Sequence, residues 1–300
     1  PMVPSYAATL LKENGYDVLW DDGIAEQLSY TDWLARIIKE SPDLIAIETK
    51  TPVVKMHWKI IDELKAKLPS AKIILMGDHA TALPEESMQN CKTDFVIQGG
   101  DYDFILASIA DKLSGKGEFD GGVWFRENGD IKKSSEYNMK AHPLDSLPMI
   151  DRKLTRSDLY AYKNGNFKYL PGSYMMSARD CWWGKCAFCV WAQECMFPGQ
   201  NFRTRSAKNA LDEVGYLIDL GIKEIMEDSG SLPIGEWLTD FCNGMIERGY
   251  NKKVVMSCNM RITGIQDPKI WQLMKRAGFR FILFGLESAN QETLDKINKN

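Results

Sequence analysis

The segment Ser173–Cys189, SYMMSARDCWWGKCAFC, decides how the second half of the sequence is interpreted. Its first five residues predict a β-strand that runs directly into a loop with three cysteines, Cys181, Cys186 and Cys189. Three thiolates on one tight loop can hold three irons of a [4Fe-4S] cluster, which leaves the fourth iron open for a substrate or cofactor. The aromatic residues of this loop would shield such a cluster from water and tune its reduction potential.

Two other interpretations of this loop remain open from its residues alone. Structural zinc prefers four ligands, and Cys195, six residues after Cys189, could supply the fourth. The cysteines could also form a group without any metal. The other three cysteines lie in or beside apolar segments and are predicted to be core residues; they are Cys91, Cys242 and Cys258.

Strand and helix patterns alternate from residue 173 onward. Strands are predicted at 173–177, 223–228, 253–260 and 279–288, and helices at 206–221, 235–249, 267–278 and 290–300. These are four β/α units in 128 residues, whereas a full (β/α)8 barrel needs about 250 residues. We therefore predict that residues 173–300 form the N-terminal half of a TIM-type barrel. The cysteine loop would leave the C-terminal end of its first strand, where barrels carry their active sites.

Residues 1–115 alternate in a similar way. Helices are predicted at 5–15, 30–41, 57–69 and 102–115, and strands at 16–20, 43–48, 72–77 and 95–100. The apolar run at 43–48 is typical of a parallel strand that is buried on both faces. The fold class is therefore α/β, with a Rossmann-like parallel sheet in residues 1–115. Because the chain opens with a helix, we expect that a first strand of this sheet is missing.

Residues 116–172 are predicted to join the two α/β regions. They begin with a β-hairpin that turns at Asn128–Gly129. An extended linker with two prolines follows at 142–154. The expected domains are thus 1–115, 116–172 and 173–300.

The composition narrows the class of protein. The chain has 300 residues and a net charge of −4, and its basic residues are scattered, which argues against a nucleic-acid partner. No apolar run approaches the ~18 residues of a membrane span, and the N-terminus carries no signal peptide. Seven cysteines, three of them clustered, favour a reducing cytoplasm over a disulfide framework. The first residue is not Met and the last residues read as mid-helix, so we expect a piece of a longer chain.

A strand, a three-cysteine loop with an aromatic residue before the last cysteine, and the β/α units that follow resemble the radical S-adenosylmethionine (SAM) enzymes. The spacing C-x4-C-x2-C differs from the usual C-x3-C-x2-C by one residue in the first gap. Residues 203–232 and 258–299 resemble the second, third and fourth units of the branch that carries a cobalamin-binding domain. Four N-terminal stretches resemble that cobalamin-binding domain: 6–22, 42–49, 73–86 and 94–106.

The resemblance implies the cofactors and the chemistry. A [4Fe-4S] cluster would reductively cleave SAM, and cobalamin would carry a methyl group to an unactivated carbon or phosphorus centre. A ring-forming or rearranging enzyme and a methylthiotransferase are the alternatives within the same chemistry. A non-catalytic cobalamin or metal sensor is the alternative from another class. The implied partners are a small-molecule or peptide substrate and an electron donor such as flavodoxin or ferredoxin.

The resemblance also assigns roles in the barrel. Cys181, Cys186 and Cys189 would ligate the cluster. Phe188 would pack against the cluster or the adenine, or serve only as hydrophobic cover. Glu227 and Asp228 end the second strand, where a carboxylate could accept the SAM ammonium group or simply cap a helix. The SAM carboxylate and ribose would be held by residues after the third and fourth strands, unless these form only surface salt bridges; they are Arg261, Glu287 and Ser288.

Cobalamin would lie at the carboxyl ends of the N-terminal strands, as ligands of doubly wound sheets do. The candidate contacts are Thr49, Thr51, Gly77, His79, Gly99 and Gly100. His79 does not fit the D-x-H-x-x-G signature of a cobalt-ligating histidine, because Asp78 directly precedes it and Ala82 stands in place of the glycine. We therefore expect it to contact the corrin at most. A nucleotide, or no ligand, would also suit these strand ends.

Overall fold

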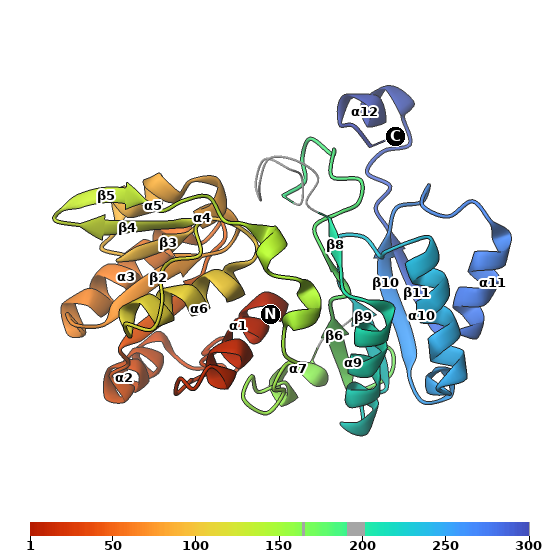
Figure 1. Ribbon diagram of the computed structural model, residues 1–300, viewed down its shortest axis with the longest axis horizontal. Coiled ribbons are helices and arrows are strands. Elements are labelled where there is room, and N and C mark those ends of the chain that lie inside the picture. Colours follow the sequence, from red (N-terminus) through yellow and green to blue (C-terminus); the bar gives the residue numbers. More distant parts are fainter. Residues whose placement is uncertain (164–165, 191–201, 300) are drawn as a thin grey trace. The chain divides into compact units, whose positions relative to one another are not determined.

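The computed structural model describes residues 1–163, 166–190 and 202–299, and the chain divides into two compact units. The first unit is essentially Val3–His142, and the second begins at Pro143. Figure 1 colours the first unit red to yellow-green and the second green to blue. Each unit is built on a sheet of its own, and the mixed α/β fold class predicted from the sequence is confirmed.

One sheet organises the first unit. Its strands are β1 (Leu44–Glu48), β2 (Lys72–Met76), β3 (Phe95–Ile97), β4 (Val123–Glu127) and β5 (Asp130–Lys133), in that order across the sheet. β1, β2 and β3 are parallel, with Ile45 opposite Ile73 and Ile74 opposite Phe95. β4 and β5 continue the sheet in antiparallel fashion. The parallel part is the arrangement that the apolar runs in the sequence predict.

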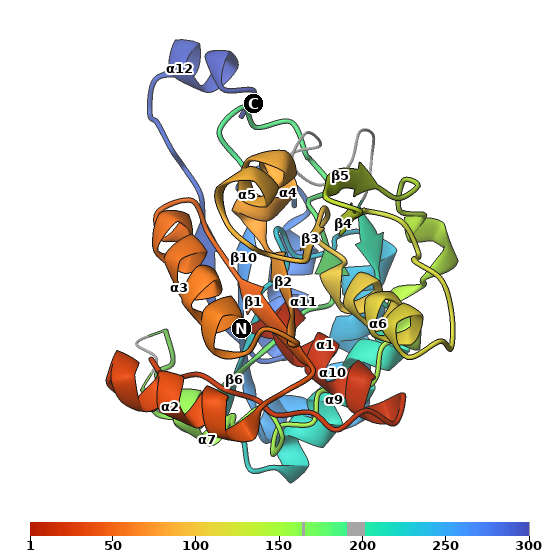
Figure 2. The ribbon, with the colours of Figure 1, turned by 90° about the vertical axis from the view of Figure 1, so that its left-hand side faces the viewer.

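Helices cover both faces of this sheet. They are α1 (Met2–Glu13), α2 (Tyr30–Glu40), α3 (Val54–Lys67), α4 (Asp78–Ala82), α5 (Pro84–Asn90) and α6 (Tyr102–Leu113). Ile73 and Leu75 of β2 pack in one buried cluster with Ile61 of α3. Ile74 between them is also fully buried, on the opposite face, since successive strand residues alternate. Figure 2 shows α3 and α6 on opposite sides of the strands.

The prediction of a strand at residues 16–20 is wrong. This stretch forms no strand, and β1 is the edge of the sheet in the described part of the chain. A strand requires a neighbour for its ladder of hydrogen bonds, and this segment is anchored to a helix instead. The Tyr16 hydroxyl donates to Asp111 Oδ1 at 2.6 Å and lies 2.7 Å from Ser114 Oγ, at the end of α6.

The predicted β-hairpin is confirmed as β4 and β5. Asn128 and Gly129 have φ angles of 52° and 91°, the left-handed conformation that a two-residue type I′ turn requires. The hairpin is part of the first sheet, because Ile97 of β3 pairs with Val123 of β4. The boundary expected at residue 115 therefore lies inside the first unit, which continues to His142.

The second unit contains a four-stranded sheet in which all strands are parallel. Its strands are β6 (Gly172–Met175), β9 (Glu224–Glu227), β10 (Val255–Met260) and β11 (Phe279–Phe284), in the order β11-β10-β9-β6. The helices that follow them are α9 (Ala207–Asp219), α10 (Glu236–Glu247), α11 (Pro268–Arg276) and α12 (Gln291–Lys296). Sequential neighbours that are parallel and joined through helices confirm the predicted half barrel.

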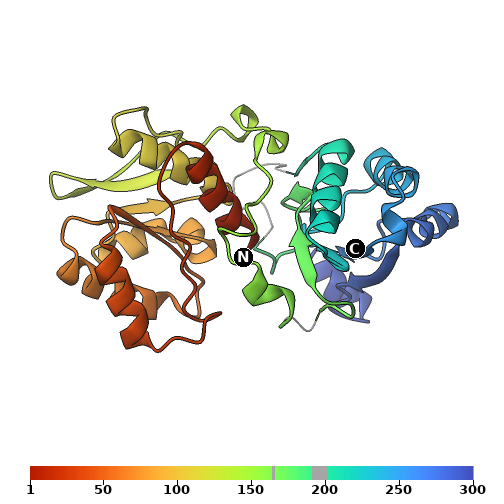
Figure 3. The ribbon, with the colours of Figure 1, turned by 90° about the horizontal axis from the view of Figure 1, so that it is seen from below.

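The helices α9, α10 and α11 lie on one face of the four strands, as Figure 3 shows. Alternate strand residues, including Ile225, Met256 and Cys258, pack against buried helix residues such as Leu211 and Phe241. Cys91, Cys242 and Cys258 are all buried, so their prediction as core residues is confirmed. The Asp267 side chain accepts a hydrogen bond from the Lys269 amide and so caps the N-terminus of α11.

Residues 142–154 are not the extended linker that their prolines suggest. Apart from His142 they belong to the second unit and contain a short 3₁₀ helix, η2 (Leu144–Ser146). Leu144 and Ile150 are buried, and Arg152 is only 9% exposed. This segment packs because it supplies both apolar side chains and a buried cation to the second unit.

The other short helices are η1 (Met139–Ala141), α7 (Asp158–Ala161) and η3 (Tyr250–Lys252).

Candidate cofactor site

The cysteine loop is anchored at its base by a two-stranded ribbon. β7 (Ala178–Arg179) leaves β6 almost at once and pairs in antiparallel fashion with β8 (Arg203–Thr204). The Ala178 amide donates to Ser229 Oγ at 2.8 Å, which ties the ribbon to the loop after β9. The cysteine loop therefore begins at the C-terminal end of the first barrel strand, which is the position predicted from the sequence.

The structure places Cys181, Cys186 and Cys189 on this loop. Cys186 is 8% exposed, whereas Cys181 and Cys189 are partly exposed. All six cysteines in the described ranges are free thiols. Within those ranges no three Cys, His, Asp or Glu side chains lie close enough to hold a metal ion. Cys195, the candidate fourth ligand, lies outside the described residues.

Arg261, at the C-terminal end of β10, reaches into the cysteine loop. Its guanidinium carbon lies 4.1 Å from the ring centroid of Trp183 and 5.7 Å from that of Trp182. Its Nη1 atom lies 4.0 Å from Cys186 Sγ. Arg261 is 6% exposed, so this is a buried cation that contacts aromatic faces and a thiol.

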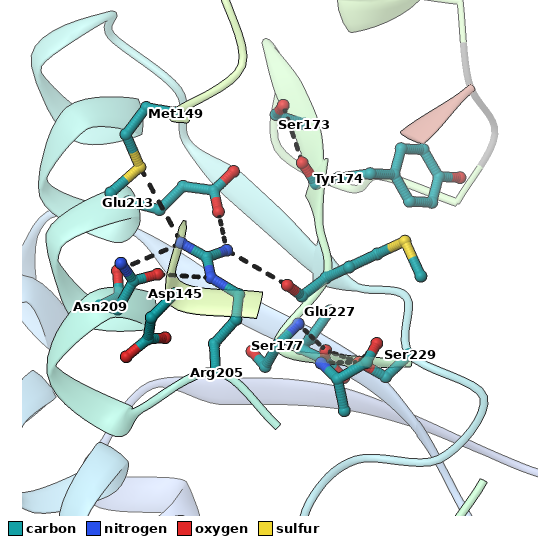
Figure 4. Close-up of polar contacts among 12 residues, drawn as sticks. Asp145, Met149, Ser173, Tyr174, Ser177, Arg205, Asn209, Glu213, Glu227 and Ser229 are labelled. Carbon is teal, nitrogen blue, oxygen red and sulfur yellow. Dashed lines mark hydrogen bonds and ion pairs between the residues drawn. The ribbon is translucent and has the colours of Figure 1, made fainter. Parts of the chain in front are cut away.

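Glu227, at the C-terminal end of β9, is fully buried and holds the base of the cysteine loop. Its Oε1 atom accepts hydrogen bonds from the Ser177 amide at 2.8 Å and from the Ser229 hydroxyl (Figure 4). Its Oε2 atom has no hydrogen-bond partner among the described residues. Burial raises the pKa of this carboxyl group to about 7, although the bonds from Ser229 and Ser177 act in the opposite direction.

The side chains of Glu227 and Asp228 point to opposite faces of the sheet. Strand residues alternate, so Glu227 lies on the same face as Ile225, which is packed in the core. Asp228 is partly exposed, and its Oδ1 atom accepts a hydrogen bond from Asn259 Nδ2 at 3.3 Å. Of the two acids, Asp228 is the one that a ligand at the carboxyl ends of the strands can reach.

A buried network of two arginines and one glutamate lies below the loop, and sequence reasoning missed it. Arg152 Nη2 donates to Glu213 Oε1 at 3.0 Å and to the Tyr174 carbonyl at 2.9 Å. Arg205 Nη1 donates to Glu213 Oε2 and, at 3.2 Å, to the Met176 carbonyl (Figure 4). The network therefore fixes the backbone of β6 just before the cysteine loop.

A signal for this network is present in the sequence. Glu213 occurs on the apolar face of the predicted helix at 206–221, between Ala210 and Leu217, and it is 1% exposed. An acid on the buried face of a helix requires a buried cationic or hydrogen-bonding partner. The sequence does not say which arginines provide it, because Arg152 lies 61 residues away along the chain.

The last part of the described chain contacts the cysteine loop. The Ala187 amide donates to the Ile297 carbonyl at 3.0 Å, and Lys299 Nζ lies 5.7 Å from the ring centroid of Phe188. Lys299 also pairs with Glu287 at 3.1 Å. The structure thus brings Phe188, which is 53% exposed, and Glu287 into one neighbourhood. Ser288 is partly exposed, and its hydroxyl accepts the Asn290 amide at 3.0 Å.

In the first unit, the carboxyl ends of β1 and β2 are closely packed. Gly77 has a φ angle of 104°, and a Cβ atom there would lie 2.5 Å from the Thr49 carbonyl oxygen. Thr49 is 1% exposed, and its Oγ1 atom lies 2.9 Å from His57 Nδ1. Gly77 is therefore required both by backbone conformation and by the close approach of the two strand ends.

His79 makes one side-chain hydrogen bond within the described part of the chain. Its Nδ1 atom lies 3.2 Å from Thr51 Oγ1. Its Nε2 atom lies 3.2 Å from Glu86 Oε2, but neither of these two atoms has a hydrogen-bond partner among the described residues. The histidine is 4% exposed and packs edge-on against Trp58.

The third strand end carries Gly99 and Gly100. Gly99 has a φ angle of 130°, and its amide donates to Thr81 Oγ1 at 3.1 Å. This bond joins helix α4, which follows β2, to the segment that follows β3. The structure thus brings Thr49, Gly77 and Gly99 to one edge of the sheet, as expected from the parallel topology.

Comparison with known proteins shows what the first unit resembles. Residues 4–104 match the family model of the B12 binding domain. The match spans all three parallel strands of the first unit, including the glycine-containing strand ends.

Related sequences cover the whole chain. It is 26% identical over 309 residues to an uncharacterized methyltransferase of Pyrococcus horikoshii and covers 63% of that protein. It is 24% identical over 313 residues to the anaerobic magnesium-protoporphyrin IX monomethyl ester cyclase of Rubrivivax gelatinosus and covers 54% of it. The chain therefore spans between half and two thirds of the length of these relatives.

Solved structures share the fold of both units. The radical S-adenosylmethionine methyltransferase TsrM of Kitasatospora setae, with tryptophan substrate and a SAM analogue bound, matches with a TM-score of 0.78 over 98% of this chain and 58% of TsrM. TsrM with cobalamin and a [4Fe-4S] cluster bound matches with a TM-score of 0.70. Sequence identity is 16% in both cases. The predicted resemblance to cobalamin-binding radical SAM proteins is thus confirmed at the level of fold.

The first unit presents apolar side chains next to its strand ends. Val53 and Met56, at the start of α3, are 38% and 52% exposed, and Leu83, between α4 and α5, is 51% exposed. These residues follow β1 and β2, on the edge that carries Gly77.

In the described part of the chain, no helix has the length and apolar character needed to cross a bilayer.

Proposed function

We propose that this protein is a cobalamin-dependent radical SAM enzyme that transfers a methyl group to an unactivated carbon or phosphorus centre. The observation that carries the proposal is the combination of a B12-binding domain with a three-cysteine loop at the C-terminal end of the first strand of a half barrel. Neither feature alone specifies the chemistry. Together they provide separate sites for a corrin and for an iron–sulfur cluster within one chain.

The donor set of the loop fits a [4Fe-4S] cluster. Cys181, Cys186 and Cys189 supply three thiols from one short loop, the number that leaves one iron open to SAM. When bound, the cluster supplies the electron that cleaves SAM into methionine and a 5′-deoxyadenosyl radical.

The protein's own residues would hold SAM beside the loop. Asp228 offers a partly exposed carboxylate for the SAM ammonium group, and Asn259 fixes its orientation. Glu287 and Ser288 remain candidates for contacts with the ribose or the carboxylate of SAM, and Phe188 for its adenine. In this proposal Glu227 supports the base of the loop, because its carboxylate accepts hydrogen bonds from the Ser177 amide and the Ser229 hydroxyl.

The B12-binding domain fits a corrin at its strand ends. Gly77 allows the ends of β1 and β2 to approach closely, and Val53, Met56 and Leu83 would provide apolar cover for a corrin beside them. Thr49, Thr51, Gly99 and Gly100 lie at the same edge. We expect His79 not to ligate cobalt, since it is only 4% exposed and its Nδ1 atom is bonded to Thr51.

Methyl transfer is favoured by the relative from Pyrococcus horikoshii and by TsrM, both of which are named methyltransferases. Ring formation is the second candidate, because two matching relatives are cyclases. The substrate would be a small molecule or a peptide, and flavodoxin or ferredoxin would supply electrons. The free thiols of the described residues fit a reducing cytoplasm.

Anaerobic purification tests this proposal. The protein should be brown, carry about four irons per chain and form 5′-deoxyadenosine from SAM once reduced. Hydroxocobalamin should stay bound through gel filtration. Colourless, zinc-loaded protein would overturn the radical assignment and support a metal sensor. SAM cleavage without retained cobalamin would instead overturn the cobalamin assignment.

A further inference from the structure

Arg261 is held in place by the aromatic residues of the cysteine loop. Its guanidinium lies over Trp183 at 4.1 Å, and the Trp183 indole is itself fixed, since Nε1 donates to the Asn298 carbonyl at 2.7 Å. Trp182 packs close to Gly264, where an added Cβ atom would lie 3.3 Å from its Cζ2 atom. The guanidinium is therefore enclosed by packed aromatic residues, and Arg261 is only 6% exposed.

This fixed cation lies next to the most buried thiol of the loop. Cys186 is the only one of the three loop cysteines that is fully buried, and its Sγ atom lies 4.0 Å from Arg261 Nη1. A buried guanidinium is costly unless it faces aromatic rings or negative charge. A cysteine that binds a metal does so as the thiolate, so Arg261 would then face an anion.

We propose that Arg261 is a positioning residue that sets the reduction potential of the cluster through the sulfur of Cys186. This inference rests on the proposed function. In the step concerned, the cluster accepts one electron from a donor of the flavodoxin or ferredoxin class, and its net charge falls by one while no bond breaks and no proton moves. An N–H···S contact and a positive charge beside a ligand sulfur stabilise the reduced state, since both are known determinants of cluster potential.

The test is the midpoint potential of Arg261→Gln, measured by EPR-monitored redox titration without SAM. The control is Arg248→Gln, which removes a positive charge from the same unit at a surface ion pair with Asp212. Loss of Arg261 should disfavour reduction by about tenfold or more, which is a shift of about 59 mV to a more negative potential. Arg248→Gln should keep the wild-type potential.

The outcomes separate this inference from the proposed function. Wild-type protein that fails to bind iron would overturn the proposed function itself. Arg261→Gln with wild-type iron content and wild-type potential would overturn only the role of Arg261. If Arg261→Gln does not retain iron, Trp183→Leu is measured instead, because it removes the ring that orients the guanidinium. A negative shift in Trp183→Leu supports the proposal, and an unchanged potential refutes it.

Discussion

Glu224 and Glu227 lie at opposite ends of strand β9, both are fully buried, and their carboxyl groups are perturbed in opposite directions. Burial pulls the pKa of Glu224 upward, but bonds from Arg280, Ser257 and two backbone amides outweigh it and leave the pKa below its usual range. Burial raises the pKa of Glu227 to about 7, since its hydrogen bonds are fewer and no cation faces it there. At neutral pH the carboxyl group of Glu224 is therefore ionised, whereas that of Glu227 lies near the midpoint of its titration.

Glu227→Gln should become more stable relative to wild type as the pH rises. Between about pH 4.5 and 7 the folded wild type keeps a proton that the unfolded chain releases, so wild-type stability falls across this window. The loss is on the order of 3 kcal/mol by pH 8. The measurement is urea unfolding of both proteins at pH 5 and pH 8. An equal difference in unfolding free energy at the two pH values would contradict the shift.

Glu224→Gln serves as the matched comparison and should show the opposite trend. Its carboxylate accepts bonds from Ser257 Oγ at 2.7 Å and from the Lys168 and Tyr169 amides at 2.8 and 3.0 Å, and it pairs with Arg280. The substitution should cost about 3 kcal/mol at pH 7. The deficit should shrink as the pH falls below about 4.5, because the unfolded wild type takes up a proton there while the folded protein, whose pKa is lower, still holds the anion.

Glu213→Ala should destabilise the second unit by about 3–5 kcal/mol, because it leaves Arg152 and Arg205 buried without their shared anion. The control is its neighbour in α9, Asp212→Ala, whose ion pairs with Lys208 and Arg248 lie at the surface. That change should cost less than about 1 kcal/mol. Chemical denaturation followed by tryptophan fluorescence checks both. Equal losses would show that the network does not fix β6.

Gly77→Ala should be far more damaging than Gly15→Ala. Both glycines have positive φ, 104° and 85°, so both substitutions strain the backbone by about 1 kcal/mol. Only at Gly77 would the new Cβ atom collide, 2.5 Å from the Thr49 carbonyl oxygen. We expect Gly77→Ala to lose at least about 2 kcal/mol more in thermal or urea unfolding.

Hydroxocobalamin binding gives a second readout for the same glycine pair. Gly77→Ala should weaken retention of the corrin at least about tenfold, and Gly15→Ala should leave it unchanged. If Gly77→Ala folds and binds hydroxocobalamin as the wild type does, the strand end at Gly77 is not part of the corrin site.

Cys186→Ala should abolish both iron loading and SAM cleavage, since two thiolates cannot hold the cluster as three do. Cys195→Ala should retain both. The measurements are iron content and 5′-deoxyadenosine formation under anaerobic conditions. Iron or zinc lost equally from the two variants would indicate a closed four-cysteine site and would remove the open position on which the chemistry depends.

Local patterns predicted most of the elements of both units. The four β/α units from residue 173, the hairpin turn at Asn128–Gly129 and the cap at Asp267 all depend on short-range sequence, and all are present. Residues 16–20 have a strand-like composition but no pairing partner, and the prolines of 142–154 suggested exposure where the segment is packed. Both errors concern contacts that are distant in sequence.

The sequence by itself determined the fold class and the chemistry on offer, because periodicity and the cysteine spacing are local properties of the chain. Only the tertiary structure decided how charged side chains are used. It turned Glu227 inward and left Asp228 accessible, enclosed Glu213 between Arg152 and Arg205, and placed Arg261 beside Cys186. The energy of a buried charge depends on which partners the fold brings to it, and those partners come from distant parts of the chain.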